Sequence, residues 1–279
     1  AGYSLAGLKI VLDCANGATY NAAPKVFKEL GAQVITMANT PNGFNINEQC
    51  GSTHMDAVRA RVVEEKADLG IALDGDGDRV LLVDANGEIV DGDEIVYIIA
   101  RYRQQTGQGC NGVAGTQMSN LGLEIALRDL GIPFQRTKVG DRYVVEALKE
   151  NGWILGGEAS GHILCSDLNT TGDGLVSALQ VILALRESGI PLSELKAGMQ
   201  KLPQTMINVR LSEKVAIDDN KAINSAVAAA EKELGDRGRV LLRPSGTEPL
   251  IRVMAEGEDQ DLVRRQVEAI AKIVEQQVG

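Results

Sequence analysis

The sequence contains two similar stretches that lie 100 positions apart, FKELGAQVI at residues 27–35 and LRDLGIPFQ at residues 127–135. Each has the pattern of a helix end, a glycine that stops the helix and a short strand. Another apolar strand precedes each stretch, at residues 8–15 and 113–115. The helices are expected at residues 17–30 and 119–130, the second with Ser119 as its N-cap. Strands that alternate with helices predict α/β folding, here two successive similar α/β units with mainly parallel sheets.

The pattern changes after Pro203. In residues 205–211, apolar and polar side chains alternate as in a strand with one solvent-exposed face. Residues 239–242 and 250–256 are predicted to form two further strands joined by a loop. Residues 218–234 and 259–278 have helical patterns. This region therefore predicts a small α+β C-terminal domain. The expected domains are residues 1–105, 106–202 and 203–279.

Composition and charge exclude several classes of protein. The net charge is −10 and aromatic residues make up 3%, which disfavours binding to nucleic acid and to anionic membranes. The four cysteines form no C-x-x-C pair and there are two histidines, so a thiolate zinc site is not expected. Scattered cysteines and the lack of a signal-peptide pattern or a membrane-length apolar run predict a cytoplasmic protein. An anionic substrate would then need a local cluster of cations.

The first expected domain contains an acidic loop, DGDGDR, directly after an apolar strand. Asp74, Asp76 and Asp78 alternate with glycines, which allow the backbone to turn three carboxylates toward one point. Their mutual repulsion favours a cation, and oxygen ligands select Mg²⁺ or Ca²⁺. An EF-hand is excluded because its sixth and twelfth places hold Arg79 and Ala85. A solvated acidic turn and an aspartyl-nucleophile phosphatase remain alternatives.

The second expected domain contains the loop GGEASGH at residues 156–162, again after a strand. Glu158, Ser160 and His162 occupy alternate positions of a glycine-rich turn. Such groups can converge on sugar hydroxyls, and His162 can exchange a proton near neutral pH. A hydrogen-bonded turn with a packed histidine is the alternative. Downstream, Asp173 is expected to cap the next helix.

The third expected domain contains RPSGTEP between two strands. The guanidinium of Arg243 can grip a phosphate in a bidentate way, and the Ser245-Gly246-Thr247 turn offers hydroxyls and backbone N–H groups. Arg252 on the following strand is a candidate assistant. A polar hairpin turn is the alternative.

These three loops, in this order, resemble the metal, sugar and phosphate loops of the α-D-phosphohexomutase superfamily, over essentially the whole chain. The segments DCANGATY, PNGFNIN, VGDRYV and NTTGDG resemble its phosphoglucosamine mutase branch. Phosphomannomutase/phosphoglucomutase relatives tend to carry histidine where this chain has Asp141.

The resemblance implies an isomerase that acts as an intramolecular phosphotransferase. It would interconvert glucosamine 6-phosphate and glucosamine 1-phosphate through a bisphosphate, with Mg²⁺ as cofactor, and feed amino-sugar nucleotide and peptidoglycan precursor synthesis. The implied site comprises Mg²⁺ ligands Asp74, Asp76 and Asp78, catalytic Arg79 and His162, and substrate-binding Glu158, Ser160, His162, Arg243, Ser245, Gly246 and Thr247.

The superfamily's first domain carries a phosphorylated serine, and no segment of this sequence resembles it. The resemblance therefore implies that the chain alone is inactive and that the N-terminal domain of the intact phosphoprotein is its partner. A phosphomannomutase/phosphoglucomutase and a non-catalytic sugar-phosphate-binding fragment remain alternative functions.

Overall fold

The chain divides into two compact units in the computed structural model, which describes residues 4–212, 217, 220–245 and 248–278. The first unit comprises Ala1–Ser119 with Leu123–Met199, and the second comprises Asn120–Gly122 with Gln200–Gly279. The first unit contains a five-stranded and a four-stranded sheet, and the second contains a three-stranded sheet.

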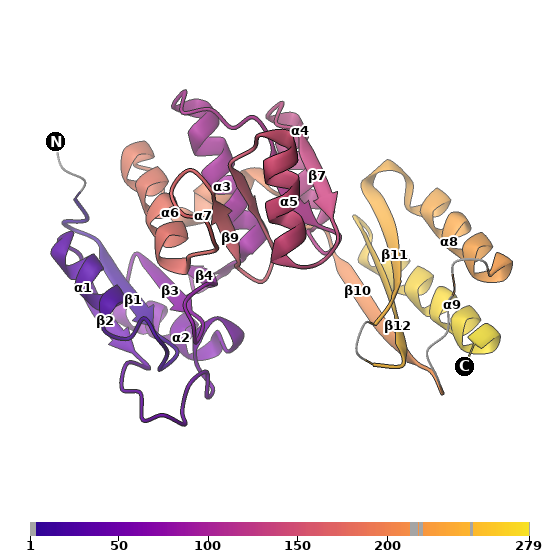
Figure 1. Cartoon of the computed structure of the whole chain (residues 1–279), viewed down its shortest axis with the longest axis horizontal. Coiled ribbons are helices and arrows are strands. Elements are labelled where there is room, and N and C mark those ends of the chain that lie inside the picture. Colours follow the sequence, from indigo (N-terminus) through magenta and orange to yellow (C-terminus); the bar gives the residue numbers. More distant parts are fainter. Residues whose placement is uncertain (1–3, 213–216, 218–219, 246–247, 279) are drawn as a thin grey trace. The chain divides into compact units, whose positions relative to one another are not determined.

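The first unit begins with a five-stranded sheet of order β2-β1-β3-β4-β5 (Figure 1). Its strands are β1 (Lys9–Asp13), β2 (Gln33–Met37), β3 (Leu69–Leu73), β4 (Val80–Asp84) and β5 (Ile89–Val90). β1 pairs in parallel with β2 and β3, whereas β4 and β5 add antiparallel. Side chains alternate between the faces of β1, so that Ile10 and Leu12 pack toward helix α1 (Ala22–Glu29) and Val11 toward helix α2 (Asp56–Glu65).

A four-stranded sheet of order β7-β6-β8-β9 repeats this plan. Its strands are β6 (Val113–Thr116), β7 (Phe134–Thr137), β8 (Leu155–Gly157) and β9 (Ile163–Cys165). The first three are again parallel and the fourth is antiparallel. Its helices are α3 (Gly92–Gln105), α4 (Leu121–Asp129), α5 (Asp141–Asn151), α6 (Gly174–Ser188) and α7 (Leu192–Leu195). The prediction of two similar α/β units with mainly parallel sheets is confirmed.

Helix α3 joins the two sheets into one core. Asp91 and Glu94 form a capping box at its start. The Asp91 side chain accepts the Glu94 N–H, and the Glu94 side chain accepts the Asp91 N–H. The helix contacts β4 of the first sheet and β8 of the second. Its side chains Ile95 and Ile99 are completely buried in a cluster that continues through both sheets.

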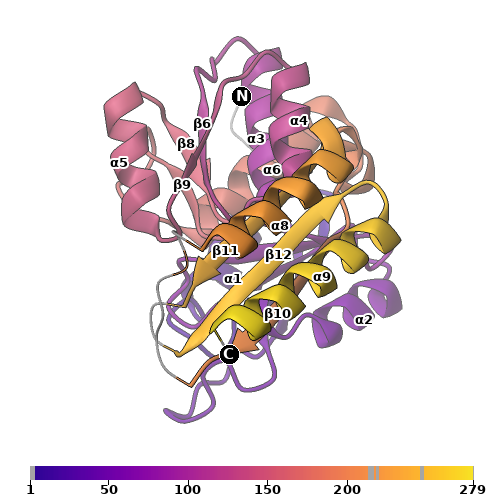
Figure 2. The same cartoon turned by 90° about the vertical axis from the view of Figure 1, so that its right-hand side faces the viewer.

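The second unit is the predicted small α+β domain. Its antiparallel sheet has the order β10-β12-β11, with β10 (Gln204–Arg210), β11 (Gly238–Pro244) and β12 (Leu250–Gly257). Helices α8 (Lys221–Leu234) and α9 (Gln260–Val278) lie across one face of this sheet (Figure 2). Val253 of β12 and Val267 of α9 are fully buried between these layers. The described residues also include short 3-10 turns at Gly51–Thr53, Lys196–Gly198 and Gly235–Arg237.

Two expected helix starts are wrong. α1 begins at Ala22 rather than at residue 17, because the preceding residues form a turn. α4 begins at Leu121, so the residue directly before the helix is Asn120 rather than Ser119, and the Ser119 hydroxyl accepts a hydrogen bond from the Thr116 N–H. Asp173 does cap α6, as expected, by accepting from the N–H groups of Leu175 and Val176.

Among the described residues, no single helix is long and apolar enough to cross a membrane, and only α6 taken with Leu192–Gly198, bent by 98°, passes on length and composition.

Candidate functional site

The acidic loop, residues 74–79, connects β3 to β4 and gathers three carboxylates. Ligand oxygens of Asp74, Asp76 and Asp78 all lie within 4.8 Å of one another. The Asp74 carboxylate organises the turn by accepting the N–H groups of Gly77 and Arg79, each at 3.1 Å. The antiparallel pairing of β3 with β4 closes the loop, so that the convergence follows from the fold itself.

The charges in this loop are unbalanced. Burial, and then the neighbouring carboxylates of Asp78 and Asp76, raise the pKa of Asp74 to about 6, although the Arg79 N–H bond acts in the opposite direction. The Arg79 Nε lies 3.9 Å from Asp74 and 3.8 Å from Asp78, beyond hydrogen-bonding distance. Three crowded carboxylates with one loosely placed guanidinium could hold a divalent metal ion, whose charge would relieve the repulsion.

The GEASGH loop, residues 157–162, is the turn of the β8–β9 hairpin, and it lies against the acidic loop. The Val80 N–H donates to the Gly161 carbonyl at 3.0 Å, and Arg79 and His162 form a β-bridge. The His162 Nδ1 lies 3.2 Å from the Asp78 Oδ2. The structure thus brings together two of the three loops that the sequence singled out.

Glu158 and Ser160 lie on the same turn. The Glu158 carboxylate accepts the N–H of Gly140, at the start of α5, at 3.0 Å and the Ser160 hydroxyl at 3.4 Å. These contacts leave further lone pairs on the carboxylate for a polyhydroxylated ligand. The Gly174 N–H, at the start of α6, donates to the Gly77 carbonyl at 2.9 Å, so two helix N-termini border the pair of loops.

The close approach of these loops depends on residues without side chains. Gly161 has φ +94°, and a Cβ there would lie 2.2 Å from the Val80 carbonyl oxygen. A Cβ at Gly92, the first residue of α3, would lie 1.9 Å from the Glu158 carbonyl oxygen. Real Cβ contacts are never this short, so both positions require glycine for a steric reason.

The imidazole of His162 is buried beside the acidic loop. It is only 6% exposed, and its Nε2 has no hydrogen-bond partner among the described residues. The ring packs on Gly172, where a Cβ would lie 2.4 Å from its atoms. Its Nδ1 contacts the Asp78 carboxylate, so the ring can support a candidate metal ligand.

We expect His162→Ala to weaken Mg²⁺ binding about 10-fold, because Asp78 loses the contact that fixes its carboxylate. His162→Asn should stay within about 3-fold of the parent, since its amide can donate from nearly the Nδ1 position. Calorimetric titration with Mg²⁺ measures both. Equal affinities in all three proteins would show that His162 does not position Asp78.

A buried aspartate that the sequence analysis missed supports the acidic loop from β1. Asp13 is fully buried, and its carboxylate accepts the N–H groups of Ala15 and Gly51, each at 2.9 Å. Burial raises the pKa of Asp13, although these two bonds oppose the shift. Ala15 has φ 52°, and the turn it makes lets the Ala18 N–H donate to the Gly75 carbonyl at 2.8 Å.

The arginine loop, residues 243–249, joins β11 to β12 in the second unit. Arg243 and Arg252 face each other across the two strands. Neither Nε has a hydrogen-bond partner among the described residues, and burial, and then the charge of Arg252, lower the pKa of Arg243. Ser245 is buried and its hydroxyl accepts the Glu248 N–H at 3.3 Å. Two opposed arginines with unpaired donors suit an anion.

The remaining predicted phosphate ligands, Gly246 and Thr247, lie outside the described residues.

Family models match nearly the whole chain. Residues 3–87 match phosphoglucomutase/phosphomannomutase alpha/beta/alpha domain II, residues 91–202 match domain III, and residues 206–273 match the C-terminal domain of the same family. The chain belongs to the phosphoglucomutase/phosphomannomutase family.

Curated relatives within the phosphoglucomutase/phosphomannomutase family are highly similar. The phosphoglucosamine mutase of Hahella chejuensis is 63% identical over 272 residues, which cover 98% of this chain and 61% of that protein. The phosphoglucosamine mutase of Cellvibrio japonicus is 57% identical over 274 residues, 98% of this chain and 62% of that protein. The chain therefore spans about three fifths of the length of these relatives.

Solved structures of phosphoglucomutase/phosphomannomutase relatives share the fold. Aspergillus fumigatus N-acetylphosphoglucosamine mutase, crystallised with GlcNAc-6P and magnesium, has a TM-score of 0.79 at 21% identity and covers 96% of this chain and 66% of its own. A phosphoglucomutase/phosphomannomutase family protein from Burkholderia thailandensis has a TM-score of 0.79 at 24% identity. The match covers 98% of this chain and 62% of that protein's chain.

Proposed function

We propose that this chain supplies the metal-, sugar- and phosphate-binding parts of a phosphoglucosamine mutase. The intact enzyme interconverts glucosamine 6-phosphate and glucosamine 1-phosphate through a bisphosphate. The observation that carries this proposal is the contact between the acidic and GEASGH loops, made by Val80, Gly161, His162 and Asp78, in a chain 63% identical to a curated phosphoglucosamine mutase.

Mg²⁺ is the proposed metal, held by Asp74, Asp76 and Asp78. Carboxylate oxygens are the ligands it prefers. Burial, and then the charges of Asp78 and Asp76, raise the pKa of Asp74, and a bound cation would stabilise the ionised carboxylates. When bound, Mg²⁺ neutralises charge on a phosphoryl group during its transfer. We assign Arg79 to the same phosphate, because its guanidinium is not engaged in a close ion pair within the loop.

The other loops are proposed to hold the sugar phosphate. Glu158 and Ser160 bind sugar hydroxyls, and Arg243 with Ser245 binds the phosphate that does not react. Support for the second assignment comes from the Nε donors of Arg243 and Arg252, which have no hydrogen-bond partner in the part of the chain that the structure describes. Gly246 and Thr247 are assigned by resemblance alone.

A phosphoserine outside these 279 residues is proposed as the phosphoryl donor, so the chain alone would be inactive. The product would enter amino-sugar nucleotide and peptidoglycan precursor synthesis. The four free, buried cysteines are consistent with the reducing cytoplasm, where we place the enzyme.

A chimera tests the function. The N-terminal part of the Hahella chejuensis relative, fused ahead of residue 1, should convert glucosamine 6-phosphate in the presence of Mg²⁺, whereas the chain alone should not. A chimera that prefers mannose or glucose phosphates would instead assign the phosphomannomutase/phosphoglucomutase activity. Turnover by the unfused chain would contradict the phosphoserine assignment.

Arg243→Gln should weaken binding of glucosamine 6-phosphate to the chain about 10- to 100-fold, because a charged bidentate contact is lost. Arg243→Lys should recover only part of the loss, since an ammonium lacks the planar fork. Calorimetry measures the affinities, with the exposed Arg265→Gln on α9 as the matched control. An unchanged affinity in Arg243→Gln would remove the arginine loop from the proposed site.

A further inference from the structure

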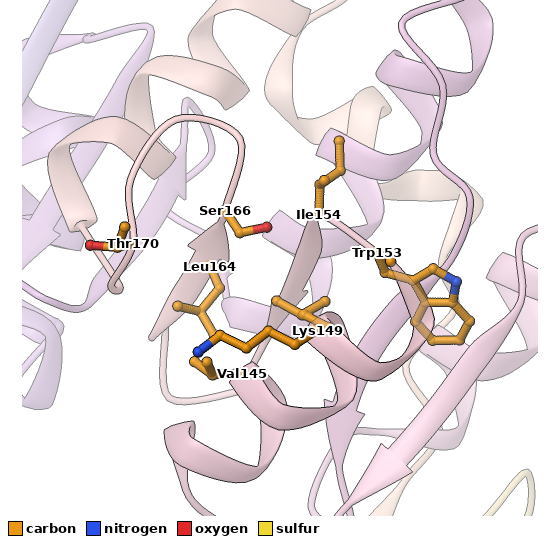
Figure 3. Close-up of a pocket in the computed structure, with 9 residues that line it drawn as sticks. Val145, Lys149, Trp153, Ile154, Leu164, Ser166 and Thr170 are labelled. Atoms are coloured by element: carbon orange, nitrogen blue, oxygen red, sulfur yellow. The ribbon is translucent and has the colours of Figure 1, made fainter.

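A pocket of about 450 Å³ opens beside α5, within the first unit, and it is separate from the paired loops (Figure 3). Leu148 of α5 and Leu164 of β9 are 3% and 2% exposed and form its buried apolar floor. Val145 and Trp153 pack on the same cluster. The volume is within the range of about 300–1,000 Å³ that is typical of small-molecule sites.

The pocket has few polar side chains, and its charge is positive. Lys149 is the only charged residue among those that line it. In Figure 3 its side chain is extended, with the amino group toward Val145 and Leu164. Ser166 and Thr170 add two hydroxyls. The protein carries a net charge of −10, so a single cation over apolar walls suits an apolar monoanion better than a dianionic phosphate ester.

We propose that this pocket binds a small monocarboxylate with an apolar ring, of the phenylpropionate or cyclohexylacetate kind. The ring lies on Leu148 and Leu164, and the carboxylate pairs with the Lys149 ammonium and accepts from the Ser166 hydroxyl. Charge complementarity selects the acid over neutral analogues of the same shape.

The pocket is distinct from the GEASGH loop although α5 serves both. Gly140, at the N-terminal end of this helix, donates to Glu158, whereas the pocket is lined by Val145, Leu148 and Lys149. Lys149 lies nine positions after Gly140, about 13.5 Å along the helix axis. A ligand in the pocket therefore should not compete directly with a sugar phosphate bound at Glu158.

The protein contains its own probe for the test, since Trp153 is its one tryptophan. Titration of the chain with 3-phenylpropionate should change tryptophan fluorescence saturably, with a Kd of about 1 mM or tighter. The neutral 3-phenylpropanamide should bind at least about 10-fold more weakly, and 10 mM glucosamine 6-phosphate should leave the Kd for the acid unchanged.

Two variants make the test specific. Lys149→Gln should weaken binding of the acid about 10-fold, so that the acid and the amide bind with similar affinity. Val145→Phe, a partly exposed position, should fill the space and abolish binding of both ligands. Lys25→Gln, an exposed lysine on α1, is the matched control and should behave as the parent. No saturable signal below about 20 mM, equal binding of acid and amide, or competition by the sugar phosphate would each overturn the proposal.

Discussion

Asp76→Asn is expected to weaken Mg²⁺ binding on the order of 100-fold without destabilising the metal-free protein. One of three converging carboxylates is lost, and ligand charge is a main determinant of affinity for hard divalent cations. Asp76 is the exposed member of the trio, and its replacement relieves repulsion on Asp74. In the metal-free state Tm should therefore stay constant or rise. Thermal unfolding with and without Mg²⁺, together with calorimetric titration, measures both effects.

The exposed Asp129→Asn at the end of α4 is the matched control and should bind Mg²⁺ as the parent does. The gain in Tm on adding Mg²⁺ should shrink as the pH falls through about 6, because a proton on Asp74 competes with the ion. Undiminished Mg²⁺ affinity in Asp76→Asn would show that these carboxylates do not form the metal site.

Gly161→Ala is expected to cost about 3 kcal/mol or more of unfolding free energy, a severe effect for one methyl group. The added Cβ would lie 2.2 Å from the Val80 carbonyl oxygen, at φ +94°. Relief requires the GEASGH loop to move off the start of β4, which also removes His162 from Asp78. Mg²⁺ affinity should fall together with stability. Urea unfolding and Mg²⁺ titration measure the pair of effects.

Gly131→Ala separates conformational strain from steric overlap. Gly131 also has positive φ, at +71°, but a Cβ there would meet nothing within 4 Å. This variant should lose only about 1 kcal/mol, the cost of the left-handed conformation, and should bind Mg²⁺ normally. If the two variants lost equal stability, contact between the loops would not be the reason for glycine at 161.

The arrangement of the sheets could be predicted because it depends on patterns that are local in the sequence. The repeat at residues 27–35 and 127–135 places β2 and β7 at equivalent edges, parallel to β1 and β6. The starts of helices α1 and α4 could not be read in the same way. The turn before α1 uses positive φ at Ala15 and Asn16, and apolar spacing carries no signal for such a conformation in residues other than glycine.

The convergence of the acidic carboxylates was predictable because alternating glycines within one loop restrict where three side chains can point. The residues outside the loop that support it could not be predicted. Asp13 lies 61 positions before Asp74 in the sequence and acts on the acidic loop through the N–H groups of Ala15 and Gly51. Gly92 looks like an ordinary residue beside a helix cap, and only the position of the Glu158 carbonyl shows why it has no side chain. Contacts between distant segments are fixed by tertiary packing.

Helix α3 has a consequence for how this protein can be divided. Its fully buried Ile95 and Ile99 belong to a cluster that includes strands of both sheets, so neither sheet retains a complete interior when separated from the other. A genetic cut between residues 105 and 106 would leave an isoleucine-rich surface on one piece and an open cavity in the other. The boundary between Met199 and Gln200, in contrast, leaves both sheets of the first unit in one piece.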